Sequence, residues 1–170
     1  MERLINVETV PAADLADNIA LSYANLSAID VQGLDIEARY RPSLNTLFVL
    51  SASFMSASTD EDQINIFVGR EEIENSVPSY SGSLFAMHEF ADSWTLSGTL
   101  SWVDEMLWLD SRDMNDGYTR LDLRLAKSFR VKDIRGEFSI QGQNLGDRYA
   151  DFDEDQFFER RLFASLKIEI

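Results

Sequence analysis

The sequence predicts an all-β fold, and three observations lead to this prediction; further features given below favour its form as an antiparallel up-and-down transmembrane β-barrel. Apolar and polar residues alternate in segment after segment, which is typical of strands that have one apolar and one polar face. No segment shows the 3.6-residue period of an amphipathic helix. The links between segments alternate between short and long, as the two ends of a meander require.

The strands of the N-terminal half are expected to be two weaker segments followed by three clear ones. In the clear segments, apolar residues recur at every second position and oppose serines or charged residues. In chain order the segments are Leu4–Val10, Ile19–Tyr23, Leu34–Tyr40, Phe48–Phe54 and Tyr80–Phe90.

The C-terminal half shows the cleanest alternation, between Ser93 and Asp104. One face of this segment holds Trp94, Leu96, Gly98, Leu100 and Trp102. The opposite face is formed by serines and threonines. The remaining strands are expected at Gly117–Phe129, where Lys127 interrupts the apolar row, at Ile134–Gln143 and at Leu162–Ile170. With two of these nine segments weak, the pattern predicts about eight strands.

The connections predict that the two ends of the sheet differ. The hairpin-length links are Arg41–Asn45, Ala91–Ser93 and Val131–Asp133. The long links are Ser58–Pro78, Glu105–Asp116 and Leu145–Phe157. Acidic clusters lie in the long links, among them Asp60–Asp62, Glu71–Glu74 and Asp151–Asp155. We therefore expect all short turns at one end and long acidic loops at the other.

The composition of the 170-residue chain excludes several classes of protein. Its 30 acidic and 15 basic residues give a net charge of -15, which argues against a nucleic-acid partner because phosphates require clustered basic residues. With no cysteine and one histidine, disulfides, thiolate chemistry and multi-histidine zinc sites are excluded. Since apolar runs do not exceed four residues, no transmembrane helix is predicted.

Alternation alone leaves open whether the apolar face is a soluble core, as in a lipocalin-like barrel or a sandwich, or a lipid-facing surface. Three features favour lipid. Most strands allow the 9 to 11 residues that a tilted transmembrane strand needs. The polar faces mix Arg, Asp, Glu and Gln, which suits a wet lumen. Aromatic residues mark both ends of apolar stripes, as the pairs Trp94 and Trp102, Tyr80 and Phe90, and Tyr118 and Phe129 illustrate.

Several stretches resemble the C-terminal part of a TonB-dependent outer-membrane receptor. One resembles the family's long strand of the type "N … G-hydrophobic-E/D … Y-x-P"; it comprises Tyr23–Asn25, Gln32–Glu37 and Tyr40–Pro42. Val77–Pro78 resembles the start of the next strand. The penultimate hairpin of the family, with its "N-L-x-D/N-x-x-Y" motif, is similar to Tyr118–Asp122, Gln143–Asp147 with Tyr149, and Arg160–Arg161. These pieces cover most of residues 20–170.

The resemblance implies a 22-stranded barrel in the Gram-negative outer membrane, filled by an N-terminal plug that binds TonB and couples import to the proton-motive force. This chain is expected to supply about the last eight strands. It shows no plug and no signal peptide, so Met1 reads as an internal start of a fragment. The partners implied are outer-membrane lipid and lipopolysaccharide, TonB only through the absent plug, and an external small-molecule ligand such as a siderophore. No cofactor is expected.

The candidate site residues are two aromatic residues in the long loops and one histidine on a strand. Trp108 and Tyr149 are the expected ligand contacts, because exposed loop aromatics often serve binding. His88 would have to be the base of a Ser-His-Asn triad, but its position on the apolar face near a short turn favours an interfacial role. We therefore expect no enzyme activity.

Two charged groups have structural interpretations that are favoured over functional ones. Asp151, Asp153, Glu154 and Asp155 could bind a hard cation, but they lack the spacing of a calcium loop and are interpreted as a solvated charge run. A polar row could contact a plug or a passing solute, although cross-strand pairing is the favoured interpretation. The row consists of Arg120, Asp122, Arg124, Arg135, Glu137, Gln141 and Gln143.

The main alternative is a self-contained eight-stranded barrel, either outer-membrane or lipocalin-like, that binds a small apolar ligand. An outer-membrane hydrolase that uses His88 is a remote third class. The sequence leaves the ligand unnamed, because siderophore, cobalamin, haem and glycan importers resemble one another in these terminal strands.

Overall fold

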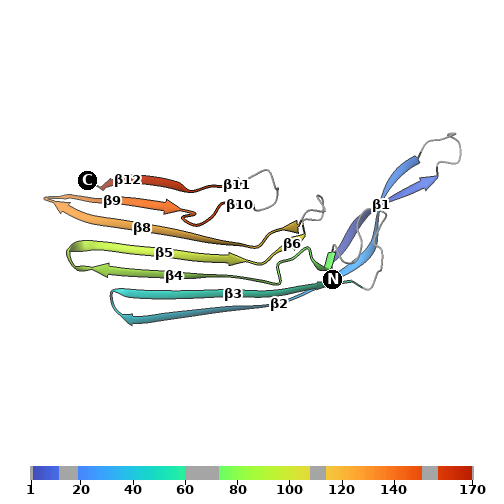
Figure 1. The fold of residues 1–170 in the computed structure, drawn as a ribbon, viewed down its shortest axis with the longest axis horizontal. Helices are drawn as coiled ribbons and strands as arrows, with labels where there is room; N and C mark the ends of the chain where they lie inside the picture. Colours follow the sequence, from blue (N-terminus) through green and yellow to red (C-terminus); the bar gives the residue numbers. More distant parts are fainter. Residues whose placement is uncertain (1, 12–18, 60–72, 108–113, 151–156, 170) are drawn as a thin grey trace.

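The computed structural model describes residues 2–11, 19–59, 73–107, 114–150 and 157–169. Side chains are described from residue 29 onward within these ranges, except at 114 and 115. The prediction of an all-β fold is confirmed, because strands dominate every described range (Figure 1). None of the helices among these residues is long and apolar enough to cross a membrane.

Eight long strands follow one another as neighbours in an antiparallel meander, in the order β1-β2-β3-β4-β5-β8-β9-β12. They are β1 (Glu2–Pro11), β2 (Ile19–Ser43), β3 (Thr46–Ser58), β4 (Tyr80–Phe90), β5 (Trp94–Val103), β8 (Tyr118–Val131), β9 (Ile134–Gln143) and β12 (Arg161–Glu169). The shorter elements are the 3-10 turn η1 (Ala91–Ser93) and the strands β6 (Met106–Leu107), β7 (Met114–Asn115), β10 (Tyr149–Ala150) and β11 (Phe157–Phe158).

Strand β2 differs from the sequence prediction, because the segments Ile19–Tyr23 and Leu34–Tyr40 belong to one strand of 25 residues. Its first part pairs with β1, from Ile19 opposite Pro11 to Ile29 opposite Glu2. From Asp30 onward it pairs instead with β3. The weaker alternation between the two predicted segments therefore marks a change of partner, not a loop.

The predicted separation of short turns and long links to opposite ends of the sheet is confirmed, whereas the acidic clusters Asp60–Asp62 and Asp151–Asp155 lie outside the described residues. The links β2–β3, β4–β5 and β8–β9 are tight and lie together at one end, which we call the short-turn end (Figure 1). The other three links, after β3, β5 and β9, are long; β6 and β7 lie in the second of them, and β10 and β11 in the third. The strand ends that these links join lie together at the opposite end, which we call the long-loop end (Figure 1).

The strand register aligns the predicted apolar rows into one face. Leu84 lies opposite Leu50 of β3 and Leu100 of β5, and the row continues through Leu121 of β8. Further along the sheet, Ile140 of β9 lies between apolar residues of β8 and β12. All seven strands from β2 to β12 therefore present their alternating apolar residues on the same side, which we call the apolar face.

The position of Tyr118 corrects one expectation, since this residue was predicted to end the apolar stripe of β8. Tyr118 pairs with Val103, whereas its neighbour Thr119 pairs with Trp102 of the apolar face. Because side chains alternate along a strand, Tyr118 lies on the polar face with Arg120 and Asp122. The other aromatics of the proposed girdles, Trp94 and Trp102 included, lie on the apolar face as predicted.

No apolar core covers the apolar face in the part of the chain that has described side chains. The buried apolar residues there are Ala57, Ile73, Leu107 and Ala126. Large apolar residues of each of the seven long strands β2, β3, β4, β5, β8, β9 and β12 are exposed, for example Leu34 at 58% and Leu166 at 61%. The fold thus exposes the kind of side chains that soluble domains bury.

The polar face contains the best-buried strand residues. Ala126 of β8 is 2% exposed and Ser139 of β9 is 4% exposed, and the Ser139 hydroxyl lies 2.8 Å from the Ser165 hydroxyl of β12. Ala57 of β3 is also buried on this face. Small side chains that are crowded on one face, opposite large exposed ones on the other, indicate that the sheet curves toward its polar face.

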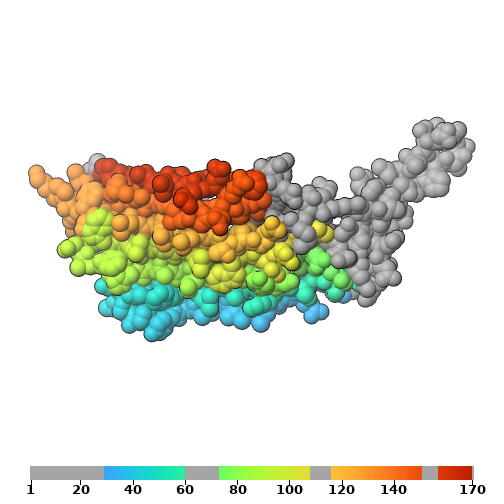
Figure 2. Space-filling model, viewed as in Figure 1, coloured from blue at the N-terminus to red at the C-terminus, as the bar shows by residue number. Residues whose placement is uncertain are grey.

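The sheet is a single layer that is open at its sides among the described residues. Figure 2 shows β2 to β12 as one continuous slab, with β2 (blue) and β12 (red) along opposite borders. The ordering of the strands includes no pairing between β12 and the N-terminal strands. The outer edge of β12 therefore leaves backbone groups without a strand partner in this arrangement.

Candidate functional site at the long-loop end

The best-formed polar cluster lies where β8 and β9 meet the long-loop end. It unites two motif pieces that are far apart in the sequence, Tyr118–Asp122 and Asn144–Tyr149. The backbone N–H of Asn144 donates a 2.9 Å hydrogen bond to the Asp122 carboxylate, and the N–H of Leu145 donates one of 2.8 Å to the Leu121 carbonyl. The two segments therefore continue the β8–β9 ladder beyond the end of β9.

Asn144 turns the chain at this point. Its φ of 47° lies in the left-handed region, which asparagine tolerates better than most residues. The residue is 3% exposed, and its Nδ2 donates a 2.7 Å hydrogen bond to the Phe158 carbonyl. Its Oδ1 is buried without a partner in the described part of the chain. Such an acceptor can receive a donor from a water or a ligand.

Arg120 and Asp122 form a two-point ion pair on the polar face of β8. The guanidinium Nε and one terminal nitrogen lie 2.9 and 2.6 Å from the two carboxylate oxygens. Side-chain exposures of 33% and 22% show that both partners are partly shielded from water. Arg120 also interacts with the Tyr149 side chain. Asp122 is thus shared between an arginine and the backbone of Asn144.

Three aromatic rings stack beside this ion pair. Tyr149 lies between Tyr118, at a centroid distance of 4.0 Å, and Phe158, at 5.2 Å. Ring planes differ by 11° and 17°, so the three rings are nearly parallel. Tyr149 was expected in an irregular loop, but it begins the short strand β10, which pairs with β11. The stack connects the base of this loop to the end of β8.

An open hollow of about 450 Å³ lies beside the stack. Tyr118 and Tyr149 line it, together with Arg148, whose guanidinium carbon lies 4.4 Å from the Phe157 ring centroid. Glycines at 117 and 146 leave space in its walls. The arrangement offers aromatic edges, one arginine and a volume within the range of small-molecule sites.

The other predicted ligand contact, Trp108, lies outside the described residues, as do Asp151, Asp153, Glu154 and Asp155. No group of residues suited to a metal ion occurs among the residues that the structure describes. In the predicted polar row, Arg124 of β8 pairs with Glu137 of β9 at 2.6 Å. This one pair agrees with the cross-strand interpretation, whereas Arg120 and Asp122 pair with each other within β8.

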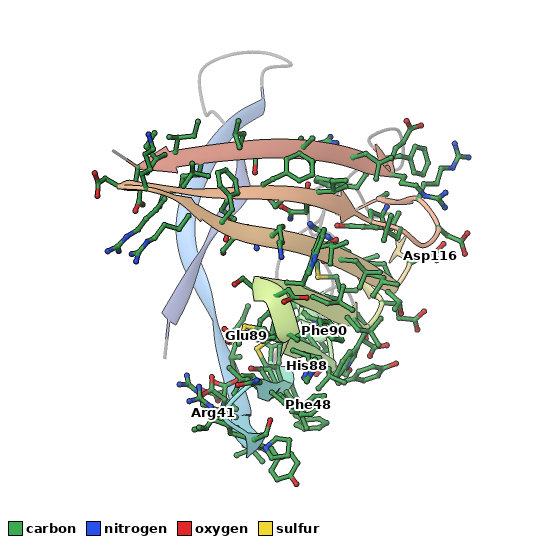
Figure 3. All side chains as sticks on the ribbon, turned by 90° about the vertical axis from the view of Figure 1, so that its left-hand side faces the viewer. Arg41, Phe48, His88, Glu89, Phe90 and Asp116 are labelled. Atoms are coloured by element: carbon green, nitrogen blue, oxygen red, sulfur yellow. The ribbon has the colours of Figure 1, made fainter. Side chains whose placement is uncertain are left out.

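His88 lies on the apolar face near the short-turn end, as predicted. Its Nδ1 is 2.8 Å from the Thr46 hydroxyl, which in turn lies 3.0 Å from the Ser43 hydroxyl. The Phe90 ring meets the imidazole edge-on at 4.5 Å. Figure 3, viewed from the short-turn end, shows His88 beside Phe48 and Phe90. The ring is therefore held among residues of the apolar face.

Sequence reasoning missed Tyr118, Asn144 and Phe158 as members of the loop-end cluster. Tyr118 could have been found, because it shares strand parity with Arg120 and Asp122. Phe158 could not, since its contact with Tyr149 depends on how the loop returns. The contacts of the cluster hold β10 and β11 beside the end of β8, and the cluster can present aromatic and polar groups to a ligand. No family model matches the chain, and no curated protein is significantly similar to it.

Proposed function

We propose that the chain forms part of the wall of an outer-membrane β-barrel, as a segment of a TonB-dependent receptor that imports a scarce ligand such as a siderophore. The observation that carries the proposal is the uncovered apolar face. Each of the seven long strands from β2 to β12 in the main sheet contributes large exposed apolar residues to it. A lipid bilayer covers such a surface without any further protein layer.

The magnitude of this exposure favours lipid over water. Burying one Leu or Phe side chain is worth roughly 1.5–3 kcal/mol. Soluble monomers rarely expose contiguous apolar patches larger than about 300–600 Å². Here the exposed apolar residues extend across seven neighbouring strands, Leu34 at one side and Leu166 at the other. Without a covering phase, this face would drive aggregation.

The details of the face suit a bilayer with two interfaces. Strands β4, β5, β8 and β9 have 11, 10, 14 and 10 residues, enough to cross when tilted. Phe90 and Trp94 lie at the short-turn end of the face, and Tyr80 and Trp102 lie toward the other. In this orientation the short turns face the periplasm and the acidic loops face the cell exterior.

The TonB-dependent part of the proposal rests on the motif resemblance. The contact between Asp122 and Asn144 supports it, because the pieces that resemble one hairpin of the family meet in one hairpin here. In this proposal the strands supply barrel wall, and Tyr149 and Trp108 contribute to an external ligand site. Transport would need the plug, through which TonB acts.

A self-contained barrel of eight strands is the second candidate, and the strand count favours it. Eight strands suffice to close a small barrel. A lipocalin-like version would place the apolar face inside. The crowding of Ala126 and Ser139 on the polar face favours the opposite curvature, so the outer-membrane version is the stronger form of this candidate.

Detergent dependence tests the membrane assignment. The chain should be monodisperse in detergent micelles, and lipids with brominated acyl chains should quench the fluorescence of Trp94 and Trp102 in a Trp108→Phe background. Quenching is expected because both indoles lie on the apolar face. A chain that stays folded and monomeric in detergent-free buffer would refute this assignment.

The receptor assignment needs a separate test. In-frame coding sequence upstream of Met1 should encode further alternating strands and a plug. A start site at Met1 with its own ribosome-binding sequence would contradict the receptor assignment while leaving the membrane assignment intact.

A further inference from the structure

Two arginines occupy directly opposite positions at the short-turn end of the polar face. The register pairs Arg130 of β8 with Arg135 of β9, and both residues are exposed. Opposite positions in an antiparallel pair bring Cβ atoms to about 4.5–5.5 Å, where like charges destabilise the sheet. An anion bound between the guanidiniums would remove this repulsion.

The carboxylates beside the two arginines already have cationic partners. Glu137 lies 2.6 Å from the Arg124 guanidinium, and Glu169, which is opposite Arg135 from β12, lies 2.6 Å from the Lys167 ammonium. Each of these acids is therefore matched by a different base. Among these described groups, neither Arg130 nor Arg135 has an acidic partner that neutralises its charge.

A hollow of about 400 Å³ lies over this position. It is lined by β8, β9 and β12, and by Ser93 of the β4–β5 turn. Arg130, Arg135 and Lys167 contribute to its wall, together with Ser128 and the two paired acids Glu137 and Glu169. This volume accommodates a small anion or the head of a larger molecule.

We propose that Arg130 and Arg135 form a binding site for a phosphate group. Two planar guanidinium forks from adjacent strands can each donate two hydrogen bonds to one tetrahedral anion. A phosphate monoester carries a charge near -2 at neutral pH, which matches the two unneutralised arginines, whereas one carboxylate matches only one. The phosphate can belong to a soluble ester or to a lipid headgroup.

This site is independent of the imported ligand and of the loop-end cluster, which lies at the other end of β8. It also does not require the barrel to be a TonB-dependent receptor. Failure of the phosphate test would therefore leave the proposed function standing, and failure of the membrane test would leave the phosphate site standing.

Calorimetric titration of the purified chain with inorganic phosphate and with pyrophosphate tests the proposal, in micelles of an uncharged detergent without phosphate. The Arg130→Gln/Arg135→Gln variant should bind at least 10-fold more weakly than the native chain. The Arg130→Lys/Arg135→Lys variant, which keeps the charge and loses the forks, should be intermediate. Arg41→Gln removes one exposed cation of β2, a strand that does not line the hollow, and should bind like the native chain.

A second measurement follows the folded state directly. Without phosphate, the double glutamine variant should unfold at the same denaturant concentration as the native chain or a higher one, because the repulsion is gone. Added phosphate should raise the denaturation midpoint of the native chain but not that of the double glutamine variant. A rise of the same size in both chains would overturn the proposal.

Vesicles distinguish the two sources of phosphate. Phosphatidylcholine vesicles with and without phosphatidic acid are compared as titrants. Binding of soluble phosphate points to a soluble ester, and binding only to phosphatidic acid points to a headgroup. The proposal is overturned if the native chain binds neither probe, or if the double glutamine variant binds as tightly as the native chain.

Discussion

Single residues show how closely neighbouring strands approach on the apolar face. Gly82 of β4 lies between Ala52 of β3 and Trp102 of β5. A Cβ atom at Gly82 would lie 2.6 Å from the Ser51 carbonyl oxygen and 2.6 Å from the Trp102 ring. The indole therefore lies across the glycine, and the missing side chain is what lets a girdle residue pack flat against the sheet.

Gly82→Ala should therefore destabilise the chain by about 1–3 kcal/mol, because the added methyl group has to displace the indole or the backbone. Denaturant unfolding in micelles, followed by tryptophan fluorescence, measures the change. Gly146→Ala is the matched control, since its nearest contact would be the Thr119 carbonyl oxygen at 3.7 Å. Equal stability of the two variants would contradict the predicted packing.

Asp122 illustrates how one carboxylate holds the loop-end cluster. It accepts hydrogen bonds from Arg120 and from the backbone of Asn144, whose own Oδ1 is already without a partner. Glu37 forms a similar pair with Arg39, also two residues apart, but that pair is far more exposed. The two pairs differ chiefly in burial and in the backbone contact.

Asp122→Ala should cost about 1–3 kcal/mol of unfolding free energy, because a buried N–H and a guanidinium lose their acceptor. Glu37→Ala should stay within about 0.5 kcal/mol, as exposed pairs contribute little. Chemical denaturation of both variants under one set of conditions compares them. Similar losses for the two would show that the cluster is no stronger than a surface ion pair.

At the scale of elements, alternation predicted the strands and their faces because a period of two is a property of the strand itself. The short turns were predictable for the same reason, since hairpin links are local. The length of β2 was not, because its residues 19–29 and 30–43 pair with different strands. The stack of Tyr118, Tyr149 and Phe158 also depends on long-range packing, which no local pattern records.

Lys127 shows how a charged residue can be accommodated in an apolar row. It lies in the apolar row of β8, opposite Trp94. Its ammonium donates a hydrogen bond to the Asp92 carbonyl in the β4–β5 turn and lies 5.3 Å from the centroid of the Trp94 ring. A lysine near the end of a membrane-spanning strand can extend in this way to the interface.

The effect of a charged side chain on stability should therefore depend on its position along the apolar row of β8. Leu123, between Gly98 and Gly142, lies midway along the apolar row. In lipid, Leu123→Lys should cost about 2–4 kcal/mol, whereas Lys127→Leu should change stability by less than about 1 kcal/mol. Unfolding from lipid vesicles measures both. A soluble sheet would tolerate Leu123→Lys, since Leu123 is already 40% exposed.

At the scale of the whole molecule, the described sheet has two edges whose backbone groups lack a neighbouring strand. Seven strands form one open layer, with β2 bordering it on one side and β12 on the other (Figure 2). Strand β1 covers only the part of β2 that ends at Ile29, so residues 30–43 have β3 on one side alone among the described strands. The edges must pair with each other or with strands of another source.

Cysteine pairing can separate these two outcomes, because the native chain contains no cysteine. Ala38 of β2 and Ala164 of β12 both lie on the apolar face at the two borders. A disulfide forms only when the Cα atoms come within about 4.4–6.8 Å. In micelles, the Ala38→Cys/Ala164→Cys variant should give disulfide-linked oligomers on oxidation, because the larger barrel that we propose would need both edges to pair with other strands. Ala38→Cys alone is the control for random collision. A monomer with an internal disulfide, detected by its mobility without reductant, would instead establish that the eight strands close on themselves.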